Sequence, residues 1–301
     1  MKRKPVYVET NIDTDMDTLW HTTQEPNLHE RWDLRFTHID YDEKQPHNDQ
    51  ASFTYETKLA FGLKVKGRGM ATGDVTGDDG KRTSGLQFSS EMPISLIKKG
   101  RGYWQYEDTG EGIRFLTQYD YSVRFGFFGK MIDRIMFRPI IGWATAWSFD
   151  AMKIWLEKSI PPEQTLQKLK IHSIICIALF IIFFYQGLVP KLLFPETGEL
   201  DLVSAVSFIH GFEREVVAII GSAQILWAVL FLLPVNKKVM FTVTAILMVV
   251  LGGAAVSANT GVLLNEPFNM VTLNVGVIAL TFIGWVNLNG VARARRNKRR
   301  P

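Results

Sequence analysis

The sequence predicts two successive units: an α+β domain over residues 1–160 and an all-α bundle of four transmembrane helices over residues 161–301. In the first unit, a curved antiparallel sheet is expected to wrap a long C-terminal helix. Three observations support this division. A chain of 301 residues is longer than the usual single domain, its charged side chains lie mostly before Lys170, and long uncharged segments follow that residue.

The first unit begins with a strand and two short helices. Residues 6–11 predict the strand. Residues 14–24 combine a capping residue, an acid three positions later and apolar residues at helical spacing, which predicts a helix. Residues 26–32 predict a second helical turn. Six strands are then expected between turn-forming residues: 34–41, 51–60, 63–72, 83–90, 97–106 and 112–125.

The last strand and the helix after it define the architecture. Residues 112–125 alternate apolar and polar side chains, so one face is buried and the other is exposed to water. From Phe128 to Lys158 the apolar period becomes helical, with a kink expected at Pro139. This order of elements predicts a sheet that closes around a helix and encloses a cavity.

Aromatic residues are abundant in the first unit. As a set they fit an apolar pocket for a hydrophobic molecule, whereas ordinary core packing explains any single one of them equally well. The candidate ligand-binding residues are Trp20, Trp32, Phe53, Tyr55, Trp104, Tyr119, Phe125 and Trp147.

Four segments without Asp, Glu, Lys or Arg predict the membrane crossings: 171–190, 216–236, 239–265 and 267–292. A helix of about 20 apolar residues crosses the hydrocarbon core and satisfies its own backbone hydrogen bonds. A soluble protein would need four buried helices in succession, none with a polar face, which is the weaker interpretation.

Lysine and arginine predict the orientation of these spans. Eleven basic residues lie at the ends expected in the cytoplasm, six of them in the basic tail from Arg293 to Arg300, and two lie on the other side. The basic N-terminus has no apolar stretch of signal-peptide length behind it. Both chain ends are therefore expected in the cytoplasm.

The second unit offers few candidates for a site. His210, Glu213 and Arg214 lie together at the entry to the second span, where charged residues often mark a site. The alternative is an interfacial cap in which Glu213 or Glu215 pairs with Arg214. Gln224 and Asn274 are polar residues within spans, and interhelical hydrogen bonds explain them adequately. All five are kept as candidate membrane-site residues.

Several functions are excluded or disfavoured. Cys176 is the only cysteine, so an intrachain disulfide, a cysteine-rich zinc site and a CxxC motif are excluded, and redox chemistry would need a bound cofactor. No metal site is expected, because the histidines lack ligand spacing. The basicity is concentrated at the terminus, which argues against nucleic-acid binding. The sequence identifies no catalytic residue and leaves open whether the protein is an enzyme.

Two segments of the first unit carry a pattern found in a known superfamily: MDTLWHTTQEPNLHERWDLRFTHIDY, and FGKMIDRIMFRPIIGWATAWSFDAMKIWLEK with its Arg138-Pro139 step. They resemble the polyketide-cyclase and START-like (SRPBCC) helix-grip domains. In the second unit the segments are FFYQGLVPKLLFP and GSAQILWAVLFLLP, which resemble the DoxX-like family of four-helix membrane proteins. Gln224 stands where DoxX relatives often carry glutamate, which weakens the case for proton-coupled redox chemistry. The resemblances imply a bacterial protein of the inner membrane.

These features lead to two main hypotheses. In the first, the cytosolic domain binds a hydrophobic small molecule such as a lipid, isoprenoid or quinone, and the membrane helices anchor or exchange it. In the second, the chain is a subunit of a quinone-linked membrane oxidoreductase that binds quinone and other membrane subunits. A structural subunit with a vestigial pocket is a third possibility. Copurified lipid without a redox-active compound would favour the first hypothesis.

Overall fold

The computed structural model describes residues 4–42, 52–58, 62–77, 80–196, 198–204, 211–258 and 269–300. The chain divides into two compact units. The N-terminal unit consists of Met1–Leu166 together with Ala292–Pro301, and the helical unit consists of Gln167–Val291. The last ten residues, which the sequence grouped with the membrane segment, thus lie in the N-terminal unit.

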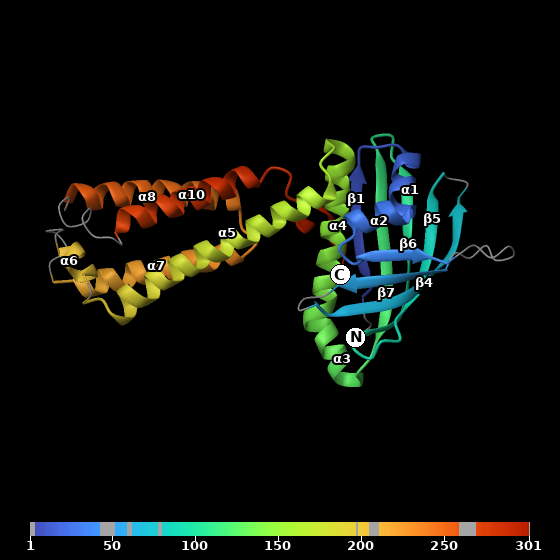
Figure 1. Ribbon diagram of the computed structural model, residues 1–301, viewed down its shortest axis with the longest axis horizontal. Coiled ribbons are helices and arrows are strands. Elements are labelled where there is room, and N and C mark those ends of the chain that lie inside the picture. The colour runs from blue at the N-terminus through green and yellow to red at the C-terminus, as the bar shows by residue number, and fades with distance from the viewer. Residues whose placement is uncertain are drawn as a thin grey trace. The chain divides into compact units, whose positions relative to one another are not determined.

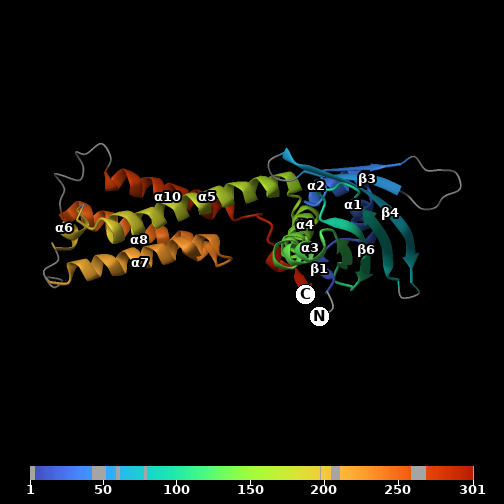
Figure 2. The ribbon, with the colours of Figure 1, turned by 90° about the horizontal axis from the view of Figure 1, so that it is seen from below.

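One antiparallel sheet forms the body of the N-terminal unit (Figures 1 and 2). Its strands are β1 (Val6–Ile12), β2 (His38–Tyr41), β3 (Ser52–Lys58), β4 (Lys64–Thr76), β5 (Arg82–Ser89), β6 (Ile97–Asp108), β7 (Ile113–Val123) and β8 (Lys298–Arg300). Their order across the sheet is β2-β3-β4-β5-β6-β7-β1-β8. The strand expected to begin at residue 34 begins later, because Phe36 N donates to the carbonyl of Asp33 at 3.1 Å and forms a turn there.

Helices lie before β2 and after β7. They are α1 (Met16–Gln24), α2 (Pro26–Trp32), α3 (Gly126–Ile132) and α4 (Arg138–Lys158), with a π-helical turn, η2 (Asp133–Phe137), between the last two. Asp15 caps α1 by accepting from Thr18 N at 2.7 Å. The interruption expected at Pro139 takes the form of η2, because a proline lacks the N–H and its ring crowds the preceding turn.

The core of the N-terminal unit lies between the sheet and α4. Phe115 on β7 and Phe149 on α4 are fully buried, and their rings stack with centroids 4.5 Å apart. Complete burial of a phenylalanine side chain contributes about 1.5–3 kcal/mol, so this pair fixes α4 against the sheet. The observed order, in which the sheet wraps its C-terminal helix, agrees with the predicted helix-grip arrangement.

The basic tail completes this sheet. Strand β8 pairs with β1, with Arg299 opposite Val8. Before it, Asp150 on α4 accepts from Arg293 N at 2.6 Å and from Arg296 Nη1 at 3.0 Å. The tail was expected to act only as a topology signal. Its backbone also supplies an edge strand, and the buried carboxylate of Asp150 binds it.

The described helices of the second unit are α5 (Pro162–Leu188), which begins in the N-terminal unit, η3 (Val189–Leu193), α6 (Glu199–Ser204), α7 (Glu213–Leu232), α8 (Lys237–Ala258) and α10 (Met270–Asn287). Among the described residues, two helical segments are long and apolar enough to cross a membrane, Pro162–Leu193 and Glu213–Leu232. Val271–Asn287 is a shorter apolar helix.

Four helices of this unit share one core, with buried residues Leu179 and Phe183 on α5, Phe231 on α7, Phe241 on α8 and Val277 on α10. Two glycines bring α5 and α7 together: a Cβ on Gly187 would lie 2.6 Å from the carbonyl oxygen of Gly221. Small residues at such crossings let membrane helices touch along their backbones.

The start of α5 lies beside the end of α10. Asn287 Nδ2 donates to the carbonyl of Lys168 at 2.8 Å, and Lys168 Nζ donates to the carbonyl of Asn289 at 2.5 Å. The chain therefore enters and leaves this set of helices at the same end.

Candidate functional site

A cavity of about 130 Å³ lies on the sheet of the N-terminal unit. Helices α1 and α2, the turn after α2, strands β2 to β7 and the first half of α4 supply its wall. Aromatic side chains form a large part of that wall, among them Phe36, Phe53, Tyr55, Phe88, Trp104 and Tyr119. An apolar protein cavity of about 150 Å³ is large enough to bind benzene. The space therefore suits one ring or a short chain segment.

One ion pair gives this cavity a polar side. Arg35 lines the wall, and its Nη2 donates to Oδ2 of Asp33 at 2.6 Å. His29 Nε2 lies 3.1 Å from the same oxygen. Burial alone would raise the pKa of the Asp33 carboxyl, but Arg35 and His29 outweigh it and hold that pKa well below its usual range. Because Asp33 stays ionised, the pair offers hydrogen-bond donors without net charge.

Two tyrosine hydroxyls lie in the same wall. The Tyr119 hydroxyl is 2.8 Å from Thr145 Oγ1, and the Tyr55 hydroxyl donates to the carbonyl of Ser89 at 3.3 Å. Burial raises the pKa of Tyr55 to about 12. Burial also raises the pKa of Tyr119, against the opposing effect of Arg35. At physiological pH both groups are therefore neutral phenols.

Four of the eight aromatic residues predicted from the sequence line this cavity: Phe53, Tyr55, Trp104 and Tyr119. The other four lie elsewhere. Trp32 and Trp147 are 1% and 2% exposed and belong to the core. Trp20 packs on Tyr106, with ring centroids 5.0 Å apart, and Phe125 is 58% exposed at the surface.

The sequence reasoning missed the polar side of the cavity. Arg35 and His29 form this polar side, and Phe36 lines the cavity beside them. None of these three residues was a candidate from the sequence. The segment HERWDLRF does contain a signal, since an acid and a base two residues apart are flanked by aromatic residues. Charged side chains are mostly exposed in proteins, and neither Asp33 nor Arg35 was a candidate site residue.

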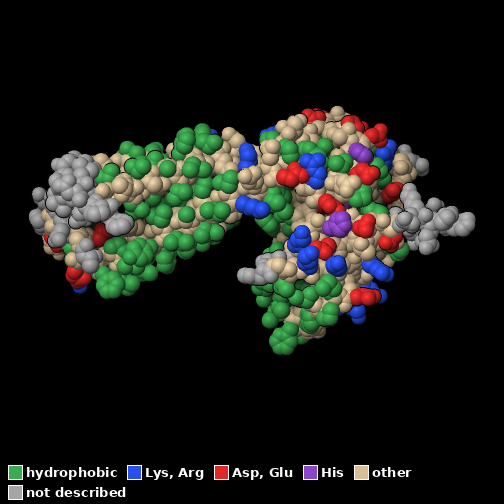
Figure 3. Space-filling model, in the orientation of Figure 1, with side chains coloured by type: hydrophobic (Ala, Val, Ile, Leu, Met, Phe, Trp, Pro, Cys, Tyr) green, Lys and Arg blue, Asp and Glu red, His purple; other side chains and the backbone are tan. Residues whose placement is uncertain are grey.

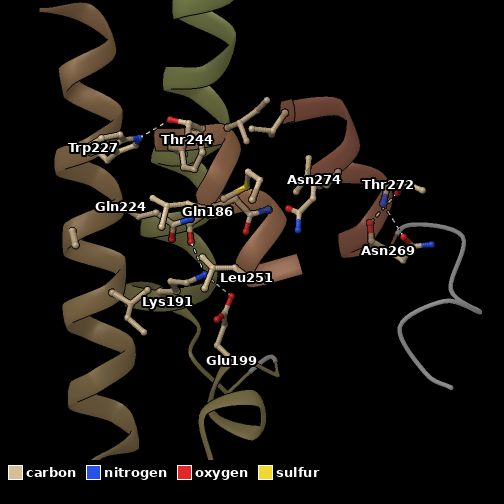
Figure 4. Close-up of a pocket in the computed structure, with 18 residues that line it drawn as sticks. Gln186, Lys191, Glu199, Gln224, Trp227, Thr244, Leu251, Asn269, Thr272 and Asn274 are labelled. Atoms are coloured by element: carbon tan, nitrogen blue, oxygen red, sulfur yellow. Dashed lines mark hydrogen bonds and ion pairs between the residues drawn. The ribbon is translucent and has the colours of Figure 1, made fainter. Parts of the chain in front are cut away.

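A second, larger cavity of about 960 Å³ lies within the helical unit (Figure 4). Four carboxamides lie around it: Gln186 on α5, Gln224 on α7, Asn274 on α10, and Asn269, which caps α10. Among the described residues, Gln224 Oε1 is a buried oxygen with no hydrogen-bond partner. Gly252 on α8 makes room for Asn274, because a Cβ there would lie 2.7 Å from Asn274 Nδ2. The carboxamides add uncharged donors and acceptors to the apolar side chains of the wall.

The charged groups of this cavity are paired. Lys191 Nζ donates to Glu199 Oε1 at 2.6 Å at one end (Figure 4). Trp227 Nε1 donates to Thr244 Oγ1 at 3.0 Å on the wall between α7 and α8. A ligand here would meet amide groups and a neutralised ion pair.

Of the five predicted membrane-site residues, Gln224 and Asn274 line this cavity. Glu213 accepts from Gly211 N at 3.0 Å. Arg214 pairs with Glu196, which differs from the expected interfacial cap, in which its partner was Glu213 or Glu215. His210 lies outside the described residues. Within the described ranges, no group of three or more His, Cys, Asp or Glu residues is placed to hold a metal ion.

Known proteins resemble both halves of the chain. The DoxX-like family model matches residues 180–282. The uncharacterized membrane protein YndG of Bacillus subtilis (strain 168) is 40% identical over 239 residues, which cover 79% of this chain and 80% of that protein.

Two solved structures are similar to the N-terminal half. One is a STAR-related lipid transfer protein from Xanthomonas axonopodis, 12% identical, covering 46% of this chain and 79% of that one, with a TM-score of 0.37. The other is a protein of unknown function from Staphylococcus aureus, 12% identical, covering 52% and 94%, with a TM-score of 0.36. Likenesses at this level identify no ligand. This chain belongs to the family of the membrane protein YndG, and its residues 180–282 match the DoxX-like family model.

Proposed function

We propose that this protein is a membrane-anchored binding protein whose N-terminal unit holds a small, mostly apolar molecule. The observation that carries the proposal is the cavity on the sheet, which has aromatic walls and a single buried ion pair, Arg35–Asp33, at its polar side. Binding pockets for small molecules combine these features, because apolar walls supply the affinity and a few polar groups fix the orientation.

The size and polarity of the cavity define the ligand class. With about 130 Å³, it accommodates a ring or the end of a chain, so a whole phospholipid is too large. Arg35, already neutralised by Asp33, would donate to a carbonyl or hydroxyl oxygen. An isoprenoid alcohol or a quinone ring meets both conditions, whereas a free carboxylate would compete with Asp33 for Arg35.

The helical cavity favours a second candidate function, in which the helices bind the quinone of a membrane oxidoreductase. Its support is the set of carboxamides at Gln186, Gln224 and Asn274 around a cavity of about 960 Å³, which is within the usual size of ligand pockets. The unpartnered oxygen of Gln224 would accept from a quinol hydroxyl. A quinone carbonyl would instead need an amide N–H, which a rotated carboxamide supplies.

The proposal includes an arrangement in the inner membrane with four crossings and both chain ends in the cytoplasm. The distribution of Lys and Arg around the helices supports the orientation. The bonds that join Lys168 to Asn287 and Asn289 support an even number of crossings, because they bring the start of α5 beside the end of α10.

Native mass spectrometry of the full chain, released from detergent, tests both sites. We expect the protein to carry a bound small molecule. Leu86 lines the sheet cavity and Ala223 lines the helical cavity, so Leu86→Trp and Ala223→Trp each fill one of them. Loss of the bound mass in Leu86→Trp alone supports the proposed function.

Two exposed apolar positions provide matched controls, Val75→Trp on β4 and Ile219→Trp on α7, which are 65% and 68% exposed. Both controls should retain the bound molecule. Loss in Ala223→Trp alone would support the second candidate function instead. If both filled variants keep the bound mass, or the original chain carries none after incubation with ubiquinone-1 or farnesol, neither cavity is a binding site.

A further inference from the structure

The helical segment that follows β7 is apolar on its outside. Nine large apolar side chains between Phe125 and Trp143 are at least 40% exposed: Phe125, Phe127, Phe128, Met131, Ile132, Ile135, Met136, Ile140 and Trp143. We call this set the interfacial strip. Figure 3 shows apolar side chains gathered over α3 in the N-terminal unit. A water-facing helix normally shows the opposite pattern.

The inner side of the same segment contains a buried ion pair. Asp133 is 1% exposed and accepts from the Tyr121 hydroxyl at 2.7 Å and from Arg138 Nε at 3.2 Å. Arg138 also donates to Asp120 Oδ1 at 2.7 Å. These bonds fix the rotation of the segment and keep the interfacial strip outward. The strip is therefore built into the fold, because turning it inward would break a buried ion pair.

The exposed charged side chains of this segment are all positive. Lys130 and Arg134 are exposed, whereas the acid Asp133 is buried and Arg138 has a side chain only 16% exposed. Apolar side chains flanked by exposed cations are typical of helices that lie in the headgroup region of a bilayer, where cations meet anionic phosphates.

The chain also keeps this segment near a membrane. Only Ser159, Ile160 and Pro161 separate the end of α4 from the start of α5, the first apolar helix. A protein tethered by so short a connection meets the bilayer surface at a high local concentration. Extended patches of this kind otherwise carry a risk of aggregation.

We propose that the interfacial strip lies in the headgroup region of the membrane that holds the protein, with its aromatic and aliphatic side chains among the acyl chains and with Lys130 and Arg134 on anionic phospholipid. The N-terminal unit then rests on the bilayer, and is not only tethered to it. This inference does not depend on a ligand in either cavity.

Spin labels on the full chain in nanodiscs test this directly. Single cysteines are placed at Phe128 and Ile135 of the strip, and at Val75 on β4 as an exposed apolar control, in a chain with Cys176→Ala. The discs contain phosphatidylcholine with or without phosphatidylglycerol. With phosphatidylglycerol, labels at 128 and 135 should be several-fold more accessible to oxygen than to a water-soluble nickel complex, as expected for the bilayer interface. The label at 75 should show the reverse.

The second part of this test removes the positive charges of the segment. The double variant Lys130→Gln/Arg134→Gln should make both strip labels more accessible to the nickel complex and less accessible to oxygen. Omission of phosphatidylglycerol should change both accessibilities in the same direction. Hydrogen exchange of residues 126–137 in the unaltered chain provides a check that needs no label, since it should slow when phosphatidylglycerol is present. Water-like accessibility at both strip positions would overturn the proposal. So would spin–spin broadening that shows a second copy of the chain on the strip.

Discussion

Asp33 fixes both the backbone and the side chain of Arg35. Its Oδ1 accepts from Arg35 N at 3.0 Å and from Arg35 Nε at 2.9 Å, while Oδ2 accepts from Nη2 at 2.6 Å. A carboxylate that bonds the backbone two residues later forms an Asx-turn. The same short turn therefore ends α2 and holds the guanidinium at the cavity wall, so that a ligand would meet a donor whose position is already fixed.

Asp33→Asn should destabilise the N-terminal unit. The change leaves the buried Arg35 charge without its counter-ion, and loss of one partner of a buried pair costs about 3–5 kcal/mol. Hydrogen exchange of β7 amides in the full chain measures this loss. Arg31→Gln is the control, because it breaks an exposed pair with Glu163 and should cost less than about 1 kcal/mol. Equal exchange in the two variants would contradict the prediction.

Asp33 also makes stability depend on pH. Its pKa in the folded protein lies below the unfolded value of about 3.9, so the unfolded chain binds the proton more readily. The stability from this pair is therefore complete above about pH 5 and is lost as the pH falls towards the folded pKa. In acid titrations, Asp33→Asn should lose less stability than the original chain, and an equal loss would argue against this assignment.

Local patterns predicted most of the sheet, because alternation and turn residues are properties of neighbouring residues. Phe125 shows their limit. Alternation put it on the buried face of the last strand, but the strand ends at Val123 and Phe125 has a left-handed φ of 63°. That conformation breaks the alternation, and Phe125 is exposed. Local patterns could not predict strand β8, because it pairs with β1 from the other end of the chain. Its Lys and Arg residues had been interpreted as signals of membrane orientation.

The candidate site was predictable only in part for a similar reason. Aromatic content indicated a pocket, but which rings face the cavity depends on how α4 packs. Trp147 on α4 lies in the core, whereas Trp104 on β6 reaches the cavity. Gln224 was identified as a polar residue in a span, and its place in a cavity depends on the crossing at Gly187 and Gly221.

Truncation of two tryptophans should separate core from cavity wall. Trp147→Ala should cost about 3–5 kcal/mol by leaving a void, with the bound mass in native spectra retained by the folded fraction. Trp104→Ala should cost less stability and reduce the bound mass more, since one side of this ring already faces empty space. Hydrogen exchange and native mass spectrometry on the same samples make the comparison. Large stability losses at both positions without any change in binding would indicate a solid core.

Gly187 should tolerate no side chain, whereas Gly276 should. A Cβ on Gly187 would lie 2.6 Å from the carbonyl oxygen of Gly221, while one on Gly276 of α10 meets nothing within 4 Å. Gly187→Ala should therefore lower the melting temperature in detergent. Gly276→Ala should leave it unchanged or raise it, because alanine favours a helix over glycine by about 1 kcal/mol. The opposite ranking of the two variants would rule out the close crossing of α5 and α7.

The basic tail should be protected from protease by Asp150. Asp150 accepts from Arg293 N and Arg296 Nη1, and Asn297 Nδ2 donates to the carbonyl of Ala146 at 2.5 Å. Hydrogen bonds to a charged group contribute about 1.5–3 kcal/mol each, so Asp150→Ala should release β8 and speed tryptic cleavage after Arg293. Asp120→Ala, at a carboxylate that pairs with Arg138, is the control.

The same contact bears on the α+β domain that the sequence predicts over residues 1–160, which we expect to fold on its own. A fragment of those residues lacks β8 and the partners of Asp150, so it should fold but melt at a lower temperature than the same fragment with a peptide of residues 292–300 added. Arg296→Gln in the peptide should reduce that gain, because it removes one of the two donors to Asp150. No effect of the peptide, together with equal cleavage of Asp150→Ala and the original chain, would show that the edge strand does not stabilise the domain.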